Sequence, residues 1–144
     1  MCRKVARAYS GDQIVVWGDG KQTRSFMYVD DCVEGIHRLM QSGFVRPLNL
    51  GTDELVSVDE LVKIVIDVSG KTLTLTHDRT KPQGVRGRNS DNTLLRRVLQ
   101  WEPTMPLRKG LVPTYNWIAS QVSQEVSQEK SRHPNFTGAA AIVG

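Results

Sequence analysis

The order of apolar and polar residues along this chain predicts five helices, because apolar side chains recur in steps of three and four. The first helix lies within residues 1–10, the second runs from about residue 31 to 41, and the last from about residue 107 to 122. A third is expected over residues 58–69, and a short fourth helix, with several leucines, over residues 92–99. Each carries one apolar face, as helices packed against a core do.

Two of these helices also carry signals for their ends or their packing. Ser57 and Glu60 have the spacing of a capping box, and Gly70 stands where the third helix should end. The second helix places four apolar side chains on one face, and we expect that face to be buried: Val33, Ile36, Leu39 and Met40.

Shorter apolar runs predict strands between the helices. Residues 14–17 and 25–29 are β-type runs on either side of a Gly-Asp-Gly turn at residues 18–20. A further short strand is expected at residues 47–51, and residues 71–77 alternate between polar and apolar as a half-buried strand does. Strands and helices together predict an α/β fold, with a small mixed sheet and flanking helices.

Composition narrows the class of protein. The chain has 144 residues, of which 39% are hydrophobic and 24% charged, as in an ordinary single globular domain. No apolar stretch approaches the roughly 20 residues of a membrane span. The net charge is +4, but Lys and Arg are scattered except for a cluster at residues 81–88, which argues against nucleic-acid binding. Cys2 and Cys32 lack metal-type spacing and indicate reduced thiols in the cytoplasm.

The end of the chain differs in character from the rest. After residue 126 the sequence becomes polar, and then small and unpatterned up to residue 144. We therefore expect residues 1–126 to form the folded portion and residues 127–144 to be a poorly ordered tail.

A first group of candidate binding residues lies where a strand is expected to begin. Lys21, Gln22, Thr23 and Arg24 offer hydrogen-bond donors there. Arg24 is the strongest of them, because a guanidinium presents a planar fork of donors that suits a phosphate. In the alternative interpretation Gln22 and Arg24 are the solvent face of an edge strand, and the residues alone favour neither.

A second group lies in the loop before the fourth helix. Arg86 and Arg88 alternate with glycines there, and the loop leads to a helix N-terminus, where free backbone N–H groups favour anions. Arg88 is the stronger candidate and Arg86 the weaker, while an exposed charged loop is the alternative. Asp91 is most simply a helix cap.

The residues that would carry chemistry are missing from the sequence. No glycine-rich dinucleotide turn joins a strand to a helix. Tyr9, Tyr28 and Tyr115 are not followed by lysine four positions later, and the three histidines do not cluster in the sequence. We therefore assign no catalytic, cofactor-binding or metal-binding residue.

Several motifs resemble one family of enzymes. The Trp-Gly-Asp-Gly motif at residues 17–20 and the Gln-Thr-Arg-Ser-Phe motif at residues 22–26 resemble those of extended short-chain dehydrogenases/reductases that modify nucleotide sugars. The Gly-Val-Arg-Gly-Arg-Asn-Ser-Asp-Asn motif at residues 84–92 is more specific, and resembles the GDP-mannose 3,5-epimerase family. The resemblance covers roughly residues 2–122. In that family the GDP part of the substrate is held by residues that match Lys4, Gln22, Thr23, Arg24 and Arg88 here.

The resemblance implies that the chain is the C-terminal, substrate-binding portion of such an epimerase, within the NAD(P)-binding Rossmann-fold superfamily. The complete enzyme would be a cytoplasmic homodimer that uses NAD to convert GDP-mannose to GDP-L-galactose, on the route to ascorbate. Its NAD turn, its redox Tyr and Lys and its Cys/Lys acid–base pair precede the matching region. We therefore expect no NAD binding by this chain's own motifs and no activity of the isolated chain, and whether it acts as an enzyme stays open.

Two alternatives remain at this point. The chain could be part of another nucleotide-sugar enzyme, such as a GDP-mannose 4,6-dehydratase or a UDP-sugar decarboxylase. It could also be a non-catalytic nucleotide-binding remnant.

Overall fold

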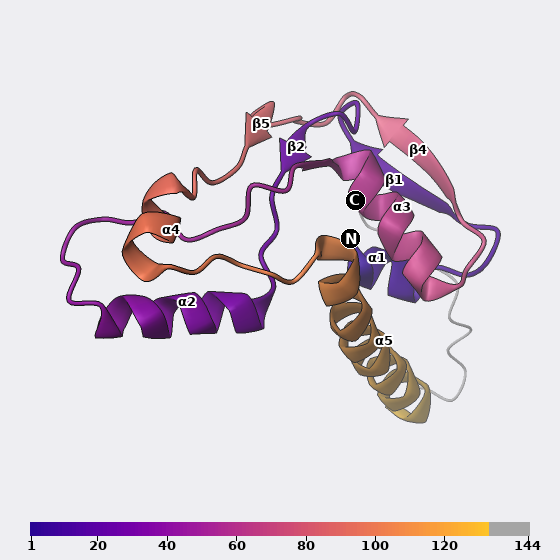
Figure 1. The fold of residues 1–144 in the computed structure, drawn as a ribbon. Coiled ribbons are helices and arrows are strands. Elements are labelled where there is room, and N and C mark those ends of the chain that lie inside the picture. Colours follow the sequence, from indigo (N-terminus) through magenta and orange to yellow (C-terminus); the bar gives the residue numbers. More distant parts are fainter. Residues whose placement is uncertain (133–144) are drawn as a thin grey trace.

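Two small sheets organise the chain, whose computed structural model describes residues 1–132 (Figure 1). In the first sheet β1 (Gln13–Trp17) pairs in parallel with β4 (Thr74–Asp78). The second sheet has the order β3–β2–β5. In it β2 (Thr23–Arg24) pairs antiparallel with β3 (Val56–Ser57) and parallel with β5 (Gly87–Arg88). The α/β class is confirmed, with the expected mixed pairing in the second sheet.

The five expected helices are all present. They are α1 (Cys2–Arg7), α2 (Val29–Gln41), α3 (Val58–Ser69), α4 (Thr93–Leu99) and α5 (Leu107–Arg132). The capping box of α3 is complete, since the side chains of Ser57 and Glu60 each accept the other residue's backbone N–H. The helix then ends at Gly70, which has the left-handed conformation that the sequence predicts there.

The two predicted strands at residues 25–29 and 47–51 are wrong. The run at residues 14–17 does form a strand, but it pairs with β4, and the turn at residues 18–20 carries the chain into the second sheet. The residues that pair with other strands there are Thr23 and Arg24, which lie just ahead of the predicted run at residues 25–29. Apolar runs this short show that a segment is extended, but they cannot show whether another strand lies beside it.

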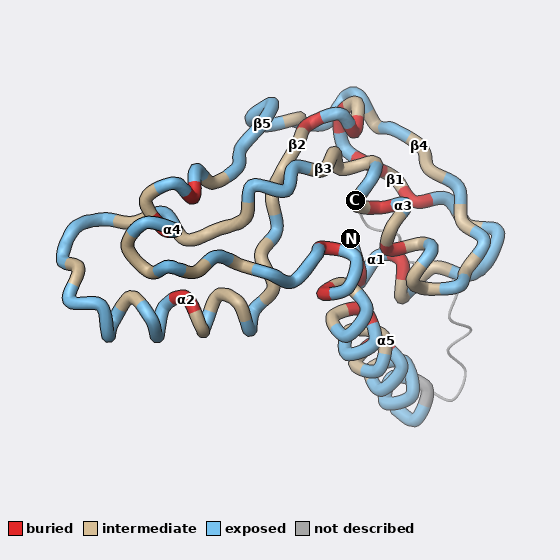
Figure 2. The backbone as a smooth tube through the Cα atoms, in the orientation of Figure 1, coloured by how far each residue is buried: buried red, intermediate tan, exposed pale blue. Residues whose placement is uncertain are grey.

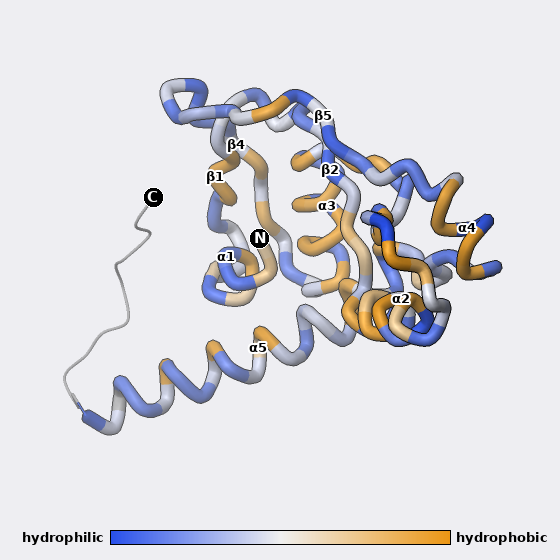
Figure 3. The backbone as a smooth tube through the Cα atoms, turned by 90° about the vertical axis from the view of Figure 1, so that its left-hand side faces the viewer, coloured by the Kyte–Doolittle hydropathy of each residue, from blue (hydrophilic) through white to orange (hydrophobic). Residues whose placement is uncertain are grey.

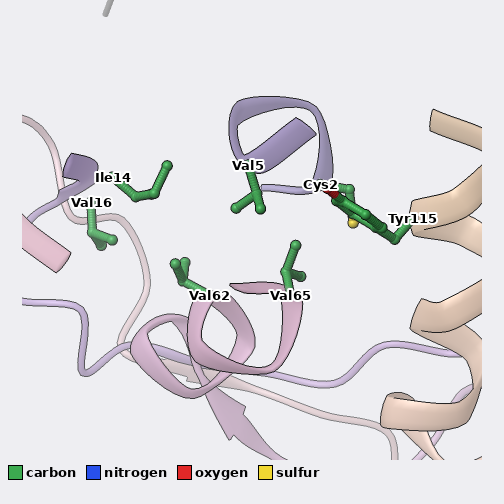
Figure 4. Packing of buried hydrophobic residues seen from close by; sticks show 7 residues of the cluster. All are labelled: Cys2, Val5, Ile14, Val16, Val62, Val65 and Tyr115. Carbon is green, nitrogen blue, oxygen red and sulfur yellow. The ribbon is translucent and has the colours of Figure 1, made fainter. Parts of the chain in front are cut away.

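The main core lies between α1, α3, β1 and the beginning of α5, where Val5 of α1 faces Val62 and Val65 of α3 (Figure 4). These three side chains are completely buried, as is that of Val16 on β1. Tyr115 of α5 closes one side of the cluster, next to Cys2 (Figure 4). We call α1, β1, α3, β4 and α5 together the packed lobe.

Long-range polar contacts hold the short helix α1 in the packed lobe. The Lys71 amine donates hydrogen bonds to the backbone carbonyls of Val5, Ala6 and Ala8, at distances of 2.9, 2.8 and 2.7 Å. These carbonyls belong to the last turn of α1 and the residue after it, where an isolated helix leaves its carbonyls unpaired. Six residues are too few for a helix to be stable alone, so α1 depends on such contacts.

The predicted burial of the α2 stripe is wrong in this structure. Val33, Ile36 and Met40 are 61%, 47% and 80% exposed, and Leu39 is half-buried. The buried residue of α2 is instead Gly35, which lies so close to Leu50 and Trp101 that an added Cβ would meet Leu50 Cδ1 at 2.5 Å. Figure 2 shows the packed lobe with most of the buried residues, and Figure 3 shows apolar residues along α2.

The last helix is longer than the sequence predicts. It continues beyond residue 122 to Arg132, and the Glu125 carboxylate on this extension accepts hydrogen bonds from Arg3 at 2.7 Å and Arg7 at 3.0 Å. Residues 127–132, predicted to be part of a poorly ordered tail, are therefore helical. The rest of the predicted tail, residues 133–144, lies outside the described residues.

Candidate functional site

The second sheet brings two of the predicted binding residues together. Arg24 on β2 and Arg88 on β5 are directly opposite each other in the parallel ladder, just as Thr23 is opposite Gly87. They come from segments more than sixty positions apart in the sequence. The Arg24 side chain is partly buried, with its Nη1 donating to the carbonyl of Thr23 at 2.6 Å, and Arg88 is exposed.

A cleft of about 380 Å³ adjoins this pair of arginines. Its walls come from β2 and the residues after it, from the segment at residues 49–52, and from β5 with the two residues that follow. The lining residues are Arg24, Ser25, Met27, Asn49, Leu50, Gly51, Thr52, Arg88, Asn89 and Ser90. A second hollow of about 360 Å³ shares Asn49 with the first, and its other lining residues include Asp91 and Arg97.

A buried asparagine joins two walls of the cleft. Asn92, which is only 3% exposed, donates from its side-chain amide to the Gly51 carbonyl at 2.8 Å. Its amide oxygen accepts the Ser90 hydroxyl at 2.8 Å, and the Ser90 backbone N–H donates to the Thr52 carbonyl at 3.4 Å. Because buried polar groups are costly unless they are paired, this network fixes the segment at residues 49–52 beside the loop that carries Arg88.

The helix cap predicted at Asp91 is one residue too early, because α4 begins at Thr93 and its N-cap position is Asn92. The Asp91 carboxylate still accepts the Thr93 backbone N–H, at 2.9 Å. The hydroxyl and backbone N–H of Thr93 lower the pKa of Asp91, so this carboxylate stays ionised. The Asp91 carboxylate therefore serves to hold the start of α4.

The charges of the cleft leave two guanidiniums available to an anion. Arg86 forms an ion pair with Asp19 at 3.0 Å, whereas neither Arg24 nor Arg88 has a carboxylate partner within residues 1–132. Like charges on adjacent strands repel each other, and an anion bound between them would relieve that repulsion. A phosphate group, with oxygens that accept bidentate hydrogen bonds, suits this arrangement.

The other three predicted binding residues do not line the cleft. Thr23 donates its backbone N–H to the Arg86 carbonyl at 2.9 Å, which ties β2 to the loop before β5. Gln22 is 7% exposed, and its amide donates to the Trp17 carbonyl at 3.2 Å. The Lys4 amine lies 3.4 Å from the Val15 carbonyl and 6.0 Å from the centre of the Trp17 ring.

Gln22 also has an unpaired oxygen. Its Oε1 is buried without a hydrogen-bond partner within the part of the chain that the structure describes. Leaving such an atom unpaired costs about 1–3 kcal/mol, so a donor that reached this oxygen would be favoured.

Several cleft residues were not singled out from the sequence. Asn49 and Gly51 belong to a segment, residues 47–51, that the sequence predicts as a buried strand, and Thr52 follows it directly. Asn92, which holds this segment in place, lies at the end of the motif at residues 84–92, where the sequence predicts no separate role for it. A signal for them was the alternation of Asn and Gly with leucine at residues 48–51, which suits a bend with close backbone approach better than a strand.

The described residues contain neither a cluster of metal-ligating side chains nor a dinucleotide-binding turn. Between residues 1 and 132, no three His, Cys, Asp or Glu side chains are grouped so that they could hold a metal ion. A dinucleotide needs a glycine-rich turn from a strand into a helix. Here the glycine turn at residues 18–20 leads from β1 into β2, and α3 is entered from β3 through Ser57. Over the same residues, no helix combines the length and the apolarity needed to cross a membrane.

The sequence is similar to those of two plant GDP-mannose 3,5-epimerases. GDP-mannose 3,5-epimerase 1 of Oryza sativa subsp. indica is 48% identical over 127 residues, which cover 88% of this chain and 33% of that protein. GDP-mannose 3,5-epimerase of Arabidopsis thaliana is 44% identical over 143 residues, 99% of this chain and 37% of that protein. The chain thus spans about a third of the length of the curated relatives it matches.

A solved structure and a family model agree with these relatives. UDP-glucuronic acid 4-epimerase from Bacillus cereus, in complex with UDP-glucuronic acid and NAD, superposes with a TM-score of 0.71 at 25% identity, over 83% of this chain and 38% of that one. The family model described as GDP-mannose 4,6 dehydratase matches residues 1–114. The chain therefore belongs to that family of nucleotide-sugar-modifying enzymes, within the extended short-chain dehydrogenases/reductases.

Proposed function

We propose that this chain is the nucleotide-sugar-binding portion of a GDP-mannose 3,5-epimerase, and that Arg24 and Arg88 grip the diphosphate of the substrate. The observation that carries the proposal is the pairing of these two arginines across adjacent parallel strands, beside a cleft and without carboxylate partners in residues 1–132. The likeness to the two plant epimerases supports a GDP-sugar as the ligand.

The role of such a portion is binding and orientation. Interactions with the nucleotide, far from the reacting carbons, hold the hexose in place for chemistry at its ring. The neighbouring hollow that shares Asn49 with the cleft gives space for parts of the ligand beyond the diphosphate. Lys4, Gln22 and Thr23 remain part of the proposal as residues matched to the family, with Thr23 and Gln22 supporting the strand that carries Arg24.

The reaction itself would need residues that this sequence lacks. Conversion of GDP-mannose to GDP-L-galactose requires a redox Tyr and Lys and an acid–base pair that precede this region in the family. We propose that the chain alone has no epimerase activity and that NAD is bound by a separate or preceding dinucleotide-binding portion.

Calorimetric titration of GDP into the 144-residue chain tests the proposal. Arg24→Ala and Arg88→Ala should each weaken GDP binding more than about tenfold, because a charge-assisted phosphate contact contributes about 1.5–3 kcal/mol. Arg132→Ala, at the exposed end of α5, is the matched control and should bind GDP as the unmodified chain does. If all three variants bind GDP as tightly as the unmodified chain does, Arg24 and Arg88 are surface charges that do not contact the diphosphate.

A second titration, with UDP in place of GDP, tests which nucleotide the site prefers. The solved neighbour binds UDP-glucuronic acid, which makes a UDP-sugar enzyme the alternative. Tighter binding of UDP than of GDP would overturn the GDP-mannose assignment while leaving the diphosphate site in place.

A further inference from the structure

Asp19, in the turn between β1 and β2, accepts three hydrogen bonds. Its Oδ1 accepts the backbone N–H of Lys21 at 2.9 Å and the side-chain amide of Gln83, and its Oδ2 accepts Arg86 Nη1 at 3.0 Å. Two of these donors, Gln83 and Arg86, come from the loop that leads to Arg88. One carboxylate therefore joins the turn before Arg24 to the loop before Arg88.

The same turn and loop also touch directly. Gly18 has a φ of 81°, and a Cβ added to it would lie 2.8 Å from Cγ of Gln83, so the loop packs against the backbone of the turn. Strand β5 begins one residue after Arg86, the partner of Asp19, and is only two residues long. So short a strand has little pairing energy of its own to fix its position beside β2.

The positive charges near Asp19 give a second reason for its role. Three guanidiniums, those of Arg24, Arg86 and Arg88, belong to this small sheet and its entering loop, and Arg86 alone of the three has a carboxylate partner in residues 1–132. The backbone N–H of Lys21, and then Arg86, lower the pKa of Asp19, which keeps this carboxylate ionised. Without the negative charge of Asp19, the loop would hold Arg86 as an uncompensated cation beside the sheet that already carries Arg24 and Arg88.

We propose that Asp19 is a positioning residue of the diphosphate site: it holds the loop at residues 83–86 so that Arg88 stays opposite Arg24. Arg86, a weaker candidate for direct phosphate contact, is in this arrangement the counter-ion of Asp19. The consequence for ligand binding rests on the proposed function, whereas the consequence for the loop is a property of the chain alone.

Amide hydrogen exchange tests the loop directly. The Thr23 N–H donates to the Arg86 carbonyl at 2.9 Å and reports whether the loop is in place. Asp19→Asn should raise the exchange rate of this amide at least about tenfold, with the amides of α3 unchanged. Asp67→Asn, which removes the charge of the carboxylate that pairs with Arg108 elsewhere on the surface, is the control and should leave exchange at Thr23 unchanged. Unchanged exchange at Thr23 in Asp19→Asn would overturn the proposal.

A second variant covers a general loss of stability. If Asp19→Asn also speeds exchange in α3, Arg86→Met decides the matter, since it removes only the loop's end of the ion pair. It must then raise exchange at Thr23 with α3 unchanged, and failure to do so overturns the proposal.

GDP titration supplies a readout that a merely structural role would not move. Asp19→Asn should weaken GDP binding about five- to tenfold in the unmodified chain, but should have no further effect in an Arg88→Ala background, because Arg88 is the group being positioned. An equal loss in both backgrounds would overturn the positioning role. If the unmodified chain binds no GDP while Asp19→Asn still releases Thr23, the proposed function fails and the positioning of the loop stands.

Discussion

The packed lobe and helix α2 have similar apolar patterns in the sequence but opposite environments in the structure. In the packed lobe Val62 and Val65 of α3 are completely buried against Val5 of α1 (Figure 4). On α2, by contrast, Val33 is 61% exposed, and the buried residue of the helix is Gly35. The comparison shows that periodicity identifies an amphipathic helix without showing what its apolar face packs against.

The difference also shows which contacts stabilise this chain. Helices α1 and α3 and the start of α5 bury their apolar faces on one another, so their side chains contribute hydrophobic free energy to folding. The stripe on α2 contributes little, and the helix is held by close backbone approach at Gly35 and by the Asp31 carboxylate, which accepts the backbone N–H groups of Thr104 and Met105 at 2.9 and 2.8 Å.

The largest effect that would separate the two regions comes from the same substitution made in each. Val62→Ala should lower the free energy of unfolding by about 1.5–3 kcal/mol, since it removes two buried methyl groups and leaves a cavity. Val33→Ala is its matched control on α2 and should change the free energy by no more than about 0.5 kcal/mol. Urea denaturation of both variants measures the contrast. Equal losses would mean that the α2 stripe is buried in solution.

A smaller effect is expected where α2 does make contact. Gly35→Ala should cost about 1–2 kcal/mol overall: overpacking against Leu50 and Trp101 costs about 1–3 kcal/mol, while alanine's better helix propensity returns up to about 1 kcal/mol. The same denaturation measurement checks it. Combining Gly35→Ala with Leu50→Ala should cost less than the sum of the two single changes, because the truncated leucine makes room for the new methyl group. Simple additivity would contradict the close contact.

The packed lobe was largely predictable from the sequence because its signals are local. The capping box at Ser57 and Glu60, the stop at Gly70 and the apolar spacing of α3 all describe contacts within or beside one helix. The positions of β1 and, approximately, of β4 were predictable for the same reason. Their parallel pairing was not, since strand pairing is decided by segments that lie far apart in the chain.

The cleft was predictable only in part. Arg24 and Arg88 stood out because guanidiniums at a strand and in a glycine-rich loop suit a phosphate, and the structure does place them side by side. The wall at residues 49–52 and its fastening by Asn92 depend on a hydrogen bond between residues 41 positions apart, for which the sequence holds no periodic signal. Asp19 likewise gains its role from loop residues that fold back onto it.

The smallest expected effect concerns the edge of the packed lobe and is visible only as a pH dependence. The hydrogen bonds from Arg3, and then those from Arg7, lower the pKa of Glu125 below its ordinary value of 4.5. A carboxylate with a lowered pKa in the folded state stabilises the fold above its unfolded pKa, and this contribution is lost as the pH falls through the folded value. Glu125→Gln should therefore lower the melting temperature slightly at pH 7, because the exposed ion pairs contribute little, and should make no difference once the pH is below the folded pKa of Glu125. The melting temperature of the variant should thus fall less steeply below about pH 5 than that of the unmodified chain. Glu129→Gln, one turn further along α5, is the control and should keep the original pH profile. On α2 the corresponding ion pair, Glu34 with Arg38, joins two residues of one helical turn, so its removal should leave the attachment of that helix to the fold unchanged.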